Sequence, residues 1–224
     1  KGTNMNVKVI WATPNIDENI AFIARVSNPD NQKNPLIENL LRFMEREGHV
    51  SPFEMANVCL EITTTRDIGR QILRHRSFSF QELSQRYKDV SDELLKAGLR
   101  EARMQDKKNR QGSLPCVDEV IAENWQHMQE KVFGIAQGAY EWAIERGIAK
   151  EQARALLPEG LTPSKMYMNG TIRSWVHYLK QRLDPSTQKE HRLIAEEILL
   201  TLSGIAPVTM SAFFNDRLHP NSDS

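Results

Sequence analysis

Hydrophobic and polar residues alternate in two short segments of the first half of the chain. A period of two is the pattern of a strand that buries one face. The first segment ends near Pro14, and its inward positions are Val7, Val9 and Trp11. The second spans 58–64, with Val58, Leu60, Ile62 and Thr64 alternating against Cys59, Glu61 and Thr63. We therefore expect two half-buried strands.

Apolar residues at helical spacing, bounded by cap and stop signals, predict that much of the remaining chain is helical. The first expected helix is capped by Asp17, carries Ile20, Ala21 and Ala24, and ends near Ser27. The second spans 35–48, with Leu36, Leu40, Phe43 and Met44 on one side, and the third spans 66–74 and is capped by Thr65. Three more are expected over 120–146, ended by Gly147, over 149–157, stopped by Pro158, and over 171–183. A last long helix is expected to begin at Asp184-Pro185 with a capping box of Thr187 and Glu190.

Two apolar stripes mark the helices expected to face the core. They are Ile172, Val176, Leu179 and Leu183 in the first, and Ile194, Ile198 and Leu202 in the second. Residues 88–117 are charged and polar, with a short helix expected near 92–97. The stretch 104–115 is long for a structureless connection, which favours a functional loop or a hairpin. The tail after Asn215 is polar and is expected to be loose.

Mostly helices with a few strands predicts an α+β fold. We expect a single domain over residues 5–224, and we treat residues 1–4, which precede Met5, as an addition to the natural chain. The length of 224 residues is sufficient for one domain.

Composition excludes several classes of protein. The 29 Lys and Arg balance 29 Asp and Glu, and this neutrality argues against a protein that coats nucleic acid. No apolar run reaches membrane-spanning length, and no export leader is evident. Cys59 and Cys116 are too few for a disulfide framework or a cysteine-based zinc site, and we expect no metal. These features predict a cytoplasmic protein of enzyme size.

Positive charge is nevertheless concentrated between Arg66 and Lys88. Arg66, Arg70 and Arg74 recur every four residues on one side of the expected helix, so they must be solvated, paired with acids or facing an anion. Ser and Phe then alternate over 77–80, which predicts an extended segment with one aromatic face. The segment is therefore either a solvated surface loop or a site for a small, nucleotide-like anion.

Arg74-His75-Arg76, followed by Phe80-Gln81-Glu82-Leu83-Ser84-Gln85-Arg86-Tyr87, resembles the signature of the flavin-dependent thymidylate synthases, and its Phe-Gln-Glu form resembles viral members. Gln81 and Gln85 depart from the usual Asn and Gly. Further blocks resemble the family in the same order: Ala24-Arg25-Val26-Ser27, His49-Val50-Ser51-Pro52-Phe53-Glu54, Ala153-Arg154-Ala155-Leu156-Leu157-Pro158 and Gly170-Thr171-Ile172-Arg173-Ser174-Trp175.

The resemblance implies an enzyme that reductively methylates dUMP to dTMP. The one-carbon donor would be 5,10-methylenetetrahydrofolate, and NADPH would supply the reducing equivalents through FAD. It also implies a small, twisted, mainly antiparallel sheet packed with long helices, and a homotetramer whose sites are shared between subunits. The compartment would be the cytoplasm of a bacterium or of a virus-infected host cell. Neither nucleic acid nor a membrane would be a partner.

The resemblance assigns roles to individual residues. Arg182 would be catalytic and would stabilise the uracil ring ionised at N3, without a cysteine nucleophile. The dUMP-binding positions are Gln71, Arg74, Glu82, Leu83, Ser84, Gln85, Arg86, Arg154 and Arg182, with Arg86 and Arg154 favoured for the phosphate. The FAD-binding positions are Ser27, Ser51, Arg74, His75, Arg76, Glu82, Thr171, Arg173 and His177.

The other histidines carry weaker expectations. His49 is a candidate for guiding folate or NADPH, whereas His127, His191 and His219 have no metal-ligand spacing and are expected at the surface. On a helical wheel Arg182 lies ~180° from Arg173, with the apolar stripe between them. One subunit would have difficulty aiming both arginines at one ligand, which suits a shared site.

Two other functions stay open at this point. A non-catalytic protein could use the same arginines to bind a nucleotide without flavin. A nucleic-acid-binding module is the other alternative, and the neutral net charge argues against it.

Overall fold

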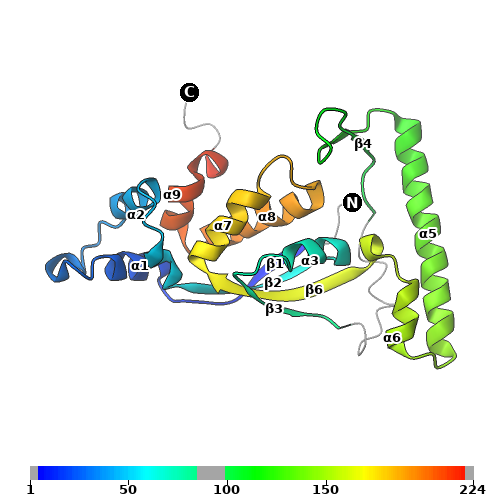
Figure 1. Cartoon of the computed structure of the whole chain (residues 1–224), viewed down its shortest axis with the longest axis horizontal. Coiled ribbons are helices and arrows are strands. Elements are labelled where there is room, and N and C mark those ends of the chain that lie inside the picture. The colour runs from blue at the N-terminus through cyan, green and yellow to red at the C-terminus, as the bar shows by residue number, and fades with distance from the viewer. Residues whose placement is uncertain (1–4, 85–98, 220–224) are drawn as a thin grey trace.

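The computed structural model describes residues 5–84 and 99–219. A four-stranded sheet in the order β1-β2-β6-β3 forms its centre, and every neighbouring pair of strands is antiparallel (Figure 1). The strands are β1 (Asn6–Ala12), β2 (Asn57–Thr65), β6 (Pro163–Thr171) and β3 (Ser79–Glu82). Helices cover this sheet, so the α+β fold with an antiparallel sheet is confirmed.

The helices are α1 (Ile16–Ala24), α2 (Glu38–Arg46), α3 (Arg66–Ile72), α5 (Glu119–Glu145), α6 (Lys150–Ala153), α7 (Ile172–Arg182), α8 (Lys189–Ser203) and α9 (Pro207–Leu218). Short 3-10 turns lie at Pro29–Asn31, Ser51–Glu54, Arg154–Leu156 and Glu159–Leu161. In Figure 1, α7 and α8 lie over the sheet, α1, α2 and α9 gather at one end, and α5 and α6 stand at the other.

The sheet shows where the alternation of residues was informative. Val58, Leu60, Ile62 and Thr64 of β2 are all buried, as expected for a strand between two partners. In β1, Val7 is buried but Val9 and Trp11 are 38% and 48% exposed, so the expected inward face of this strand is wrong. The strand lies at the edge of the sheet, and an irregularity between Val9 and Trp11 shifts its register.

The stripes of α7 and α8 are confirmed as core positions. Ile172, Val176, Leu179 and Leu183 are at most 6% exposed, and Ile194, Ile198 and Leu202 at most 1%. They pack with β2 and β6 in one hydrophobic core that includes the fully buried Trp175.

The expected starts of α1 and α8 are wrong, whereas α3 begins at Arg66 as expected. None of the three has the expected side-chain cap. Helix α1 begins at Ile16, and Asp17 instead accepts bonds from the backbone nitrogens of Val208 (2.8 Å) and Thr209 (3.0 Å) at the start of α9. The Thr65 hydroxyl donates to Asp67 rather than capping α3. Helix α8 begins only at Lys189, without a side-chain cap, so the expected capping box is wrong.

Two further boundaries differ from expectation. Helix α2 begins at Glu38, which leaves Leu36 in the preceding loop and 76% exposed, and its buried side chains are Leu41 and Met44. Helix α9 continues to Leu218, so the part of the expected loose tail between Asn215 and Leu218 is helical.

Helices α5 and α6 and a small hairpin form the end of the molecule farthest from α1 and α2 (Figure 1). The hairpin pairs β4 (Arg103–Gln105) with β5 (Ser113–Pro115), which confirms that alternative for 104–115. The short helix expected near 92–97 lies outside the described residues. Helix α5 ends before Gly147, whose φ of 75° is the left-handed conformation that favours glycine after a helix.

Candidate functional site

The last turn of α7 and the turn after α3 meet at a hydrogen bond. The Nε of Arg182 donates to Nε2 of His75 over 2.9 Å. His75 is 8% exposed, and burial, with the charges of Arg182 and His177, lowers its pKa to about 4. The ring is therefore neutral at neutral pH. On the helical wheel Arg182 lies opposite Arg173, one of the expected FAD ligands. In the fold, however, Arg182 contacts His75, another expected FAD ligand.

A second histidine lies beneath this pair. His191 of α8 is fully buried, so the expectation that it lies at the surface is wrong. Its Nε2 is 2.9 Å from the hydroxyl of Tyr178, and its Nδ1 is 3.1 Å from Oε1 of Gln71. Burial and the nearby charges of Arg182 and His75 lower its pKa to about 3. The apolar stripe of α8 gave no signal for this polar contact.

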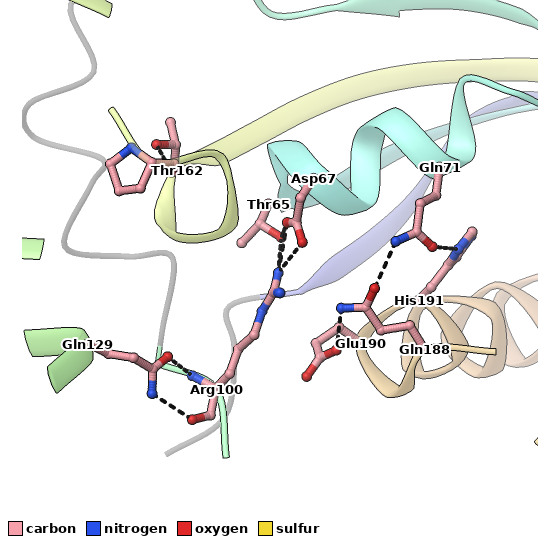
Figure 2. A network of polar contacts seen from close by, with 10 residues as sticks. Thr65, Asp67, Gln71, Arg100, Gln129, Thr162, Gln188, Glu190 and His191 are labelled. Carbon is pink, nitrogen blue, oxygen red and sulfur yellow. Dashed lines mark hydrogen bonds and ion pairs between the residues drawn. The ribbon is translucent and has the colours of Figure 1, made fainter. Parts of the chain in front are cut away.

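Gln71 joins this set to the start of α8. Its Nε2 donates to Oε1 of Gln188 over 2.8 Å, and Nε2 of Gln188 donates to the Glu190 carboxylate over 2.9 Å. Figure 2 shows the hydrogen bonds running from Glu190 through Gln188 and Gln71 to His191. Gln71 and Arg182 are both expected at the nucleotide. Arg182 bonds His75 directly, and Gln71 is linked to His75 through His191 and the ring of Tyr178.

Aromatic rings hold this region against the sheet. Tyr178 meets His75 edge to face, with ring centroids 4.8 Å apart, and Phe78 meets Trp175 at 4.7 Å. Gly170 of β6 allows this approach, because a Cβ atom there would lie 2.6 Å from Cε1 of Phe78. The extended segment expected over 77–80 leads into strand β3, which begins at Ser79. Phe78 is buried and Ser79 is exposed.

Acids pair with two of the three arginines that recur every four residues. Arg66 lies 3.9 Å from both Glu82 and Glu159, and Arg70 donates to Glu159 over 3.2 Å. Glu82 also accepts a bond of 2.6 Å from Ser164 of β6. Of the three alternatives for these arginines, pairing with acids applies to Arg66 and Arg70. Arg74 lies beyond the end of α3 and is exposed.

A second group of expected flavin residues lies around the 3-10 turn Ser51–Glu54. A cavity of about 580 Å³ is lined by His49, Ser51 and Arg173, with apolar walls from α2. Arg173 donates to Glu54 over 2.6 Å, and its side chain is 49% exposed. This volume is typical of a small-molecule pocket.

The remaining expected site residues are dispersed. The Thr171 side chain caps α7 by accepting from the backbone nitrogen of Ser174, and His177 lies 3.0 Å from Gln181. The exposed members are Ser27, Arg76 and Arg154, whereas Leu83 and Ser84 are half-buried. Gln85 and Arg86 lie outside the described residues.

Arg154 stands apart from Arg182. It lies in the turn Arg154–Leu156, and its Nε donates to the backbone of Glu151. Ala153 and Leu157 on either side pack with Tyr140 and Ala143 of α5, at the end of the molecule opposite α1 and α2 (Figure 1).

Sequence reasoning also missed Arg100. Its Nη2 is 2.7 Å from both carboxylate oxygens of Asp67, and its backbone bonds the side chain of Gln129 (Figure 2). This residue ties α3 to α5, and no helical or strand period marks it.

The comparisons with known proteins decide the family. Residues 8–208 match the model of a family described as thymidylate synthase complementing protein. The chain belongs to this family.

Relatives within the family are similar over most of their length. A flavin-dependent thymidylate synthase of Synechocystis sp. is 52% identical over 176 residues, which is 79% of each chain. A probable flavin-dependent thymidylate synthase of Paramecium bursaria Chlorella virus 1 is 46% identical over 82% of this chain and 83% of its own. The sequence resemblance, including that to viral members, is confirmed.

The fold of this family member matches a solved structure. A UMP/dUMP methylase, PolB from Streptomyces cacaoi, crystallised with 5-Br dUMP, aligns over 96% of each chain with a TM-score of 0.81 and 23% identity. At this identity the match supports the fold alone.

Both cysteines of the chain are free thiols. Cys59 is buried in β2, where burial raises its pKa, and Cys116 precedes α5. Within residues 5–84 and 99–219, no group of three or more His, Cys, Asp or Glu side chains is arranged to hold a metal ion. Over those same ranges, no helix has the length and apolar character to cross a bilayer.

Proposed function

We propose that this chain is a flavin-dependent thymidylate synthase that converts dUMP to dTMP. The one-carbon unit comes from methylenetetrahydrofolate, and NADPH is the reductant. The observation that carries the proposal is the linked set of Gln71, His191, Tyr178, His75 and Arg182, because it joins two residues assigned to dUMP with one assigned to FAD. Hydrogen bonds make every link except the one between Tyr178 and His75, which is an edge-to-face ring contact. The family match over residues 8–208 supports the same reaction.

Arg182 is the residue to which we assign the chemistry. Carbon 5 of uracil becomes a better nucleophile when N3 loses its proton and negative charge spreads over the ring. A guanidinium at the N3 edge stabilises that charge, and more so away from bulk water. The bond to His75 engages only Nε of Arg182 and leaves donors of the guanidinium for the substrate.

The other dUMP contacts are proposed at Gln71, Arg74, Glu82, Leu83, Ser84, Gln85, Arg86 and Arg154. The exposed Arg74 fits a phosphate ligand, because among the described residues no acid pairs with it. Gln71 keeps one N–H and one oxygen lone pair beyond its two bonds to Gln188 and His191.

FAD, when bound, passes reducing equivalents from NADPH to the one-carbon unit. The cavity lined by Ser51 and Arg173 fits part of FAD, since it offers a hydroxyl and a half-exposed cation beside apolar walls. We propose Ser27, Ser51, Arg74, His75, Arg76, Glu82, Thr171, Arg173 and His177 as its ligands. His49, on the same cavity, is proposed to guide the folate or NADPH.

The assembly we propose is a homotetramer. One face of α5 exposes apolar side chains in steps of four, three, four, three and finally seven residues, each 44–66% exposed: Ile121, Trp125, Met128, Val132, Ile135 and Trp142. We call this face the α5 seam. Steps of three and four are the pattern by which one helix packs along another. We propose that a second copy of the chain covers this seam.

The direct test is to purify the protein and supply dUMP, methylenetetrahydrofolate and NADPH. We expect a yellow protein that absorbs near ~450 nm through bound flavin, and formation of dTMP that depends on all three substrates. A protein that binds dUMP but holds no flavin and forms no dTMP would instead be the non-catalytic nucleotide-binding protein.

A further inference from the structure

The hydrogen bonds around His191 can run in one direction only. An ionised carboxylate only accepts hydrogen bonds, so the contact with Glu190 identifies the Gln188 nitrogen as a donor. The oxygen of Gln188 therefore accepts from the nitrogen of Gln71, and the oxygen of Gln71 must accept from Nδ1 of His191. Glu190 thus fixes the orientation of two amides and places the proton of His191 on Nδ1.

The direction continues to the next residue. A neutral histidine protonated on Nδ1 accepts at Nε2, so the Tyr178 hydroxyl is the donor in the 2.9 Å contact. Burial raises the pKa of Tyr178, which keeps that hydroxyl protonated. His75 has the same tautomer for a separate reason, because its Nε2 accepts from Arg182.

Tyr178 has little freedom to move once its hydroxyl is held. The residue is fully buried, and its ring lies between His75, Phe78 and Trp175, with centroid distances of 4.8, 6.2 and 6.0 Å. A shift of this ring would move His75, which it contacts edge to face, and with it the acceptor of Arg182.

We propose that His191 is a positioning residue, whose Nδ1 orients the amide of Gln71 for the nucleotide and whose Nε2 anchors Tyr178 beneath the His75–Arg182 pair. The proposal rests on the proposed function. It separates two effects that one histidine transmits through two atoms: Nδ1 governs binding of dUMP, and Nε2 governs the turnover that depends on Arg182.

Three substitutions at this position separate the two atoms. His191→Asn keeps a donor close to the place of Nδ1 and loses the acceptor for Tyr178. His191→Gln keeps an acceptor close to the place of Nε2 and loses the donor to Gln71. His191→Phe keeps a ring of similar shape and loses both.

The proposal predicts a crossed result for the flavin-loaded enzyme. In His191→Asn, kcat should fall about 3- to 10-fold while the dissociation constant of dUMP stays near that of the unsubstituted protein. In His191→Gln, the dissociation constant should rise by a similar factor, about 3- to 10-fold, while kcat is maintained. His191→Phe should show both changes.

A structural control is available on the same helix. Leu202→Ala removes buried apolar volume from α8 at a residue that bonds none of these groups, and it should lower the melting temperature without separating kcat from dUMP affinity. Three variants that lose kcat and affinity together, in proportion to their melting temperatures as Leu202→Ala does, would overturn the positioning role.

A measurement independent of activity completes the test. Protein labelled with ¹⁵N-histidine should give the nitrogen shifts of the Nδ1–H tautomer for both His191 and His75, and an Nε2–H tautomer at His191 would overturn the proposal. An Arg182→Ala variant with undiminished turnover would instead overturn the proposed role of Arg182. The two failures are therefore distinguishable.

Discussion

Two regions of the molecule differ in which side chains they bury. We call helices α7 and α8, which cover the sheet, the layer, and helices α5 and α6, at one end of the molecule, the arm. Tyr178 and His191 of the layer and His75, which packs against it, are buried, and each has a hydrogen-bond partner from another part of the same chain. In the arm, Trp125, Ile135 and the other side chains of the α5 seam are 44–66% exposed. The layer satisfies its buried polar groups within one chain, whereas the arm leaves an apolar face exposed.

The difference follows from what each kind of group needs. A buried polar group without a partner destabilises the fold, so the layer must satisfy its groups internally. An exposed apolar face is tolerated in isolation but gains free energy when another surface covers it. The predicted nucleotide ligands Arg182 and Arg154 lie one in each region, which makes the comparison testable.

The largest effect is expected from Arg182→Ala. Loss of a guanidinium that stabilises developing charge should lower dTMP formation about 10²- to 10³-fold while the protein still binds FAD. Rate assays and flavin absorbance of the purified variant measure the two quantities. Normal dTMP formation would exclude the N3 role.

Mixing variants tests whether the two regions serve one site. Arg154→Ala should also be impaired, through weaker dUMP binding. If each site takes Arg182 from one subunit and Arg154 from another, co-refolded Arg182→Ala and Arg154→Ala chains should recover about a quarter of the original activity. A site built within one chain would leave the mixture no more active than its components.

The next largest effect concerns the arm. Trp125→Asp and Ile135→Asp place charge on the α5 seam, and we expect light scattering to report a smaller assembly and lower activity per chain. Leu36→Asp is the matched control, since Leu36 is 76% exposed but lies before α2 and away from the α5 seam. Equal loss of mass in all three variants would contradict a specific role for the α5 seam.

The sequence predicted the elements whose burial follows a simple period. Strand β2 and the stripe of α7 were found because each has one inward face. Strand β6 was missed, although Met166 and Met168 alternate with Lys165 and Tyr167, because Pro163 and Gly170 at its ends resemble turn signals. Asp17 was expected to cap α1, because its true partners, Val208 and Thr209, lie at the far end of the chain.

For the site, motif resemblance was more informative than periodicity. Gln71 and His75 were selected from one stretch and Arg182 from another, and the fold joins them. His191 was assigned to the surface. A histidine in a polar run such as Lys189-Glu190-His191-Arg192 gives no sign that it will be buried and hydrogen-bonded to Tyr178. Contacts of this kind depend on how α7 packs on α8, and no local pattern encodes that.

Glycine substitutions should change stability in opposite directions in strand β6, which packs against the layer, and in the arm. A Cβ at Gly170 would lie 2.6 Å from Cε1 of Phe78, so Gly170→Ala should lower the free energy of unfolding by about 1–3 kcal/mol. Gly134 on α5 has open space around its position, and Gly134→Ala should raise that free energy by about 0.5–1 kcal/mol through helix propensity. Urea unfolding of both variants measures the difference, and equal signs would contradict it.

The last expected effect is a pH dependence that comes from the buried histidines His75 and His191. The pKa values of His75 and His191 are lowered from 6.5 to about 4 and about 3, so below pH 6.5 the unfolded chain binds protons that the folded chain excludes. The contribution of these two histidines to the free energy of unfolding is therefore fully present above that pH. It is lost as the pH falls, by at most about 1.4 kcal/mol per pH unit for each histidine.

Urea unfolding between about pH 7 and about pH 5 measures this slope. His191→Phe should reduce it, because one buried neutral histidine is gone. His127→Gln is the control: His127 is exposed on α5, so its ring remains in water in the folded chain and the slope should stay unchanged. A slope that His127→Gln reduces as much as His191→Phe does would mean that the pH dependence is not specific to the buried histidines of the layer.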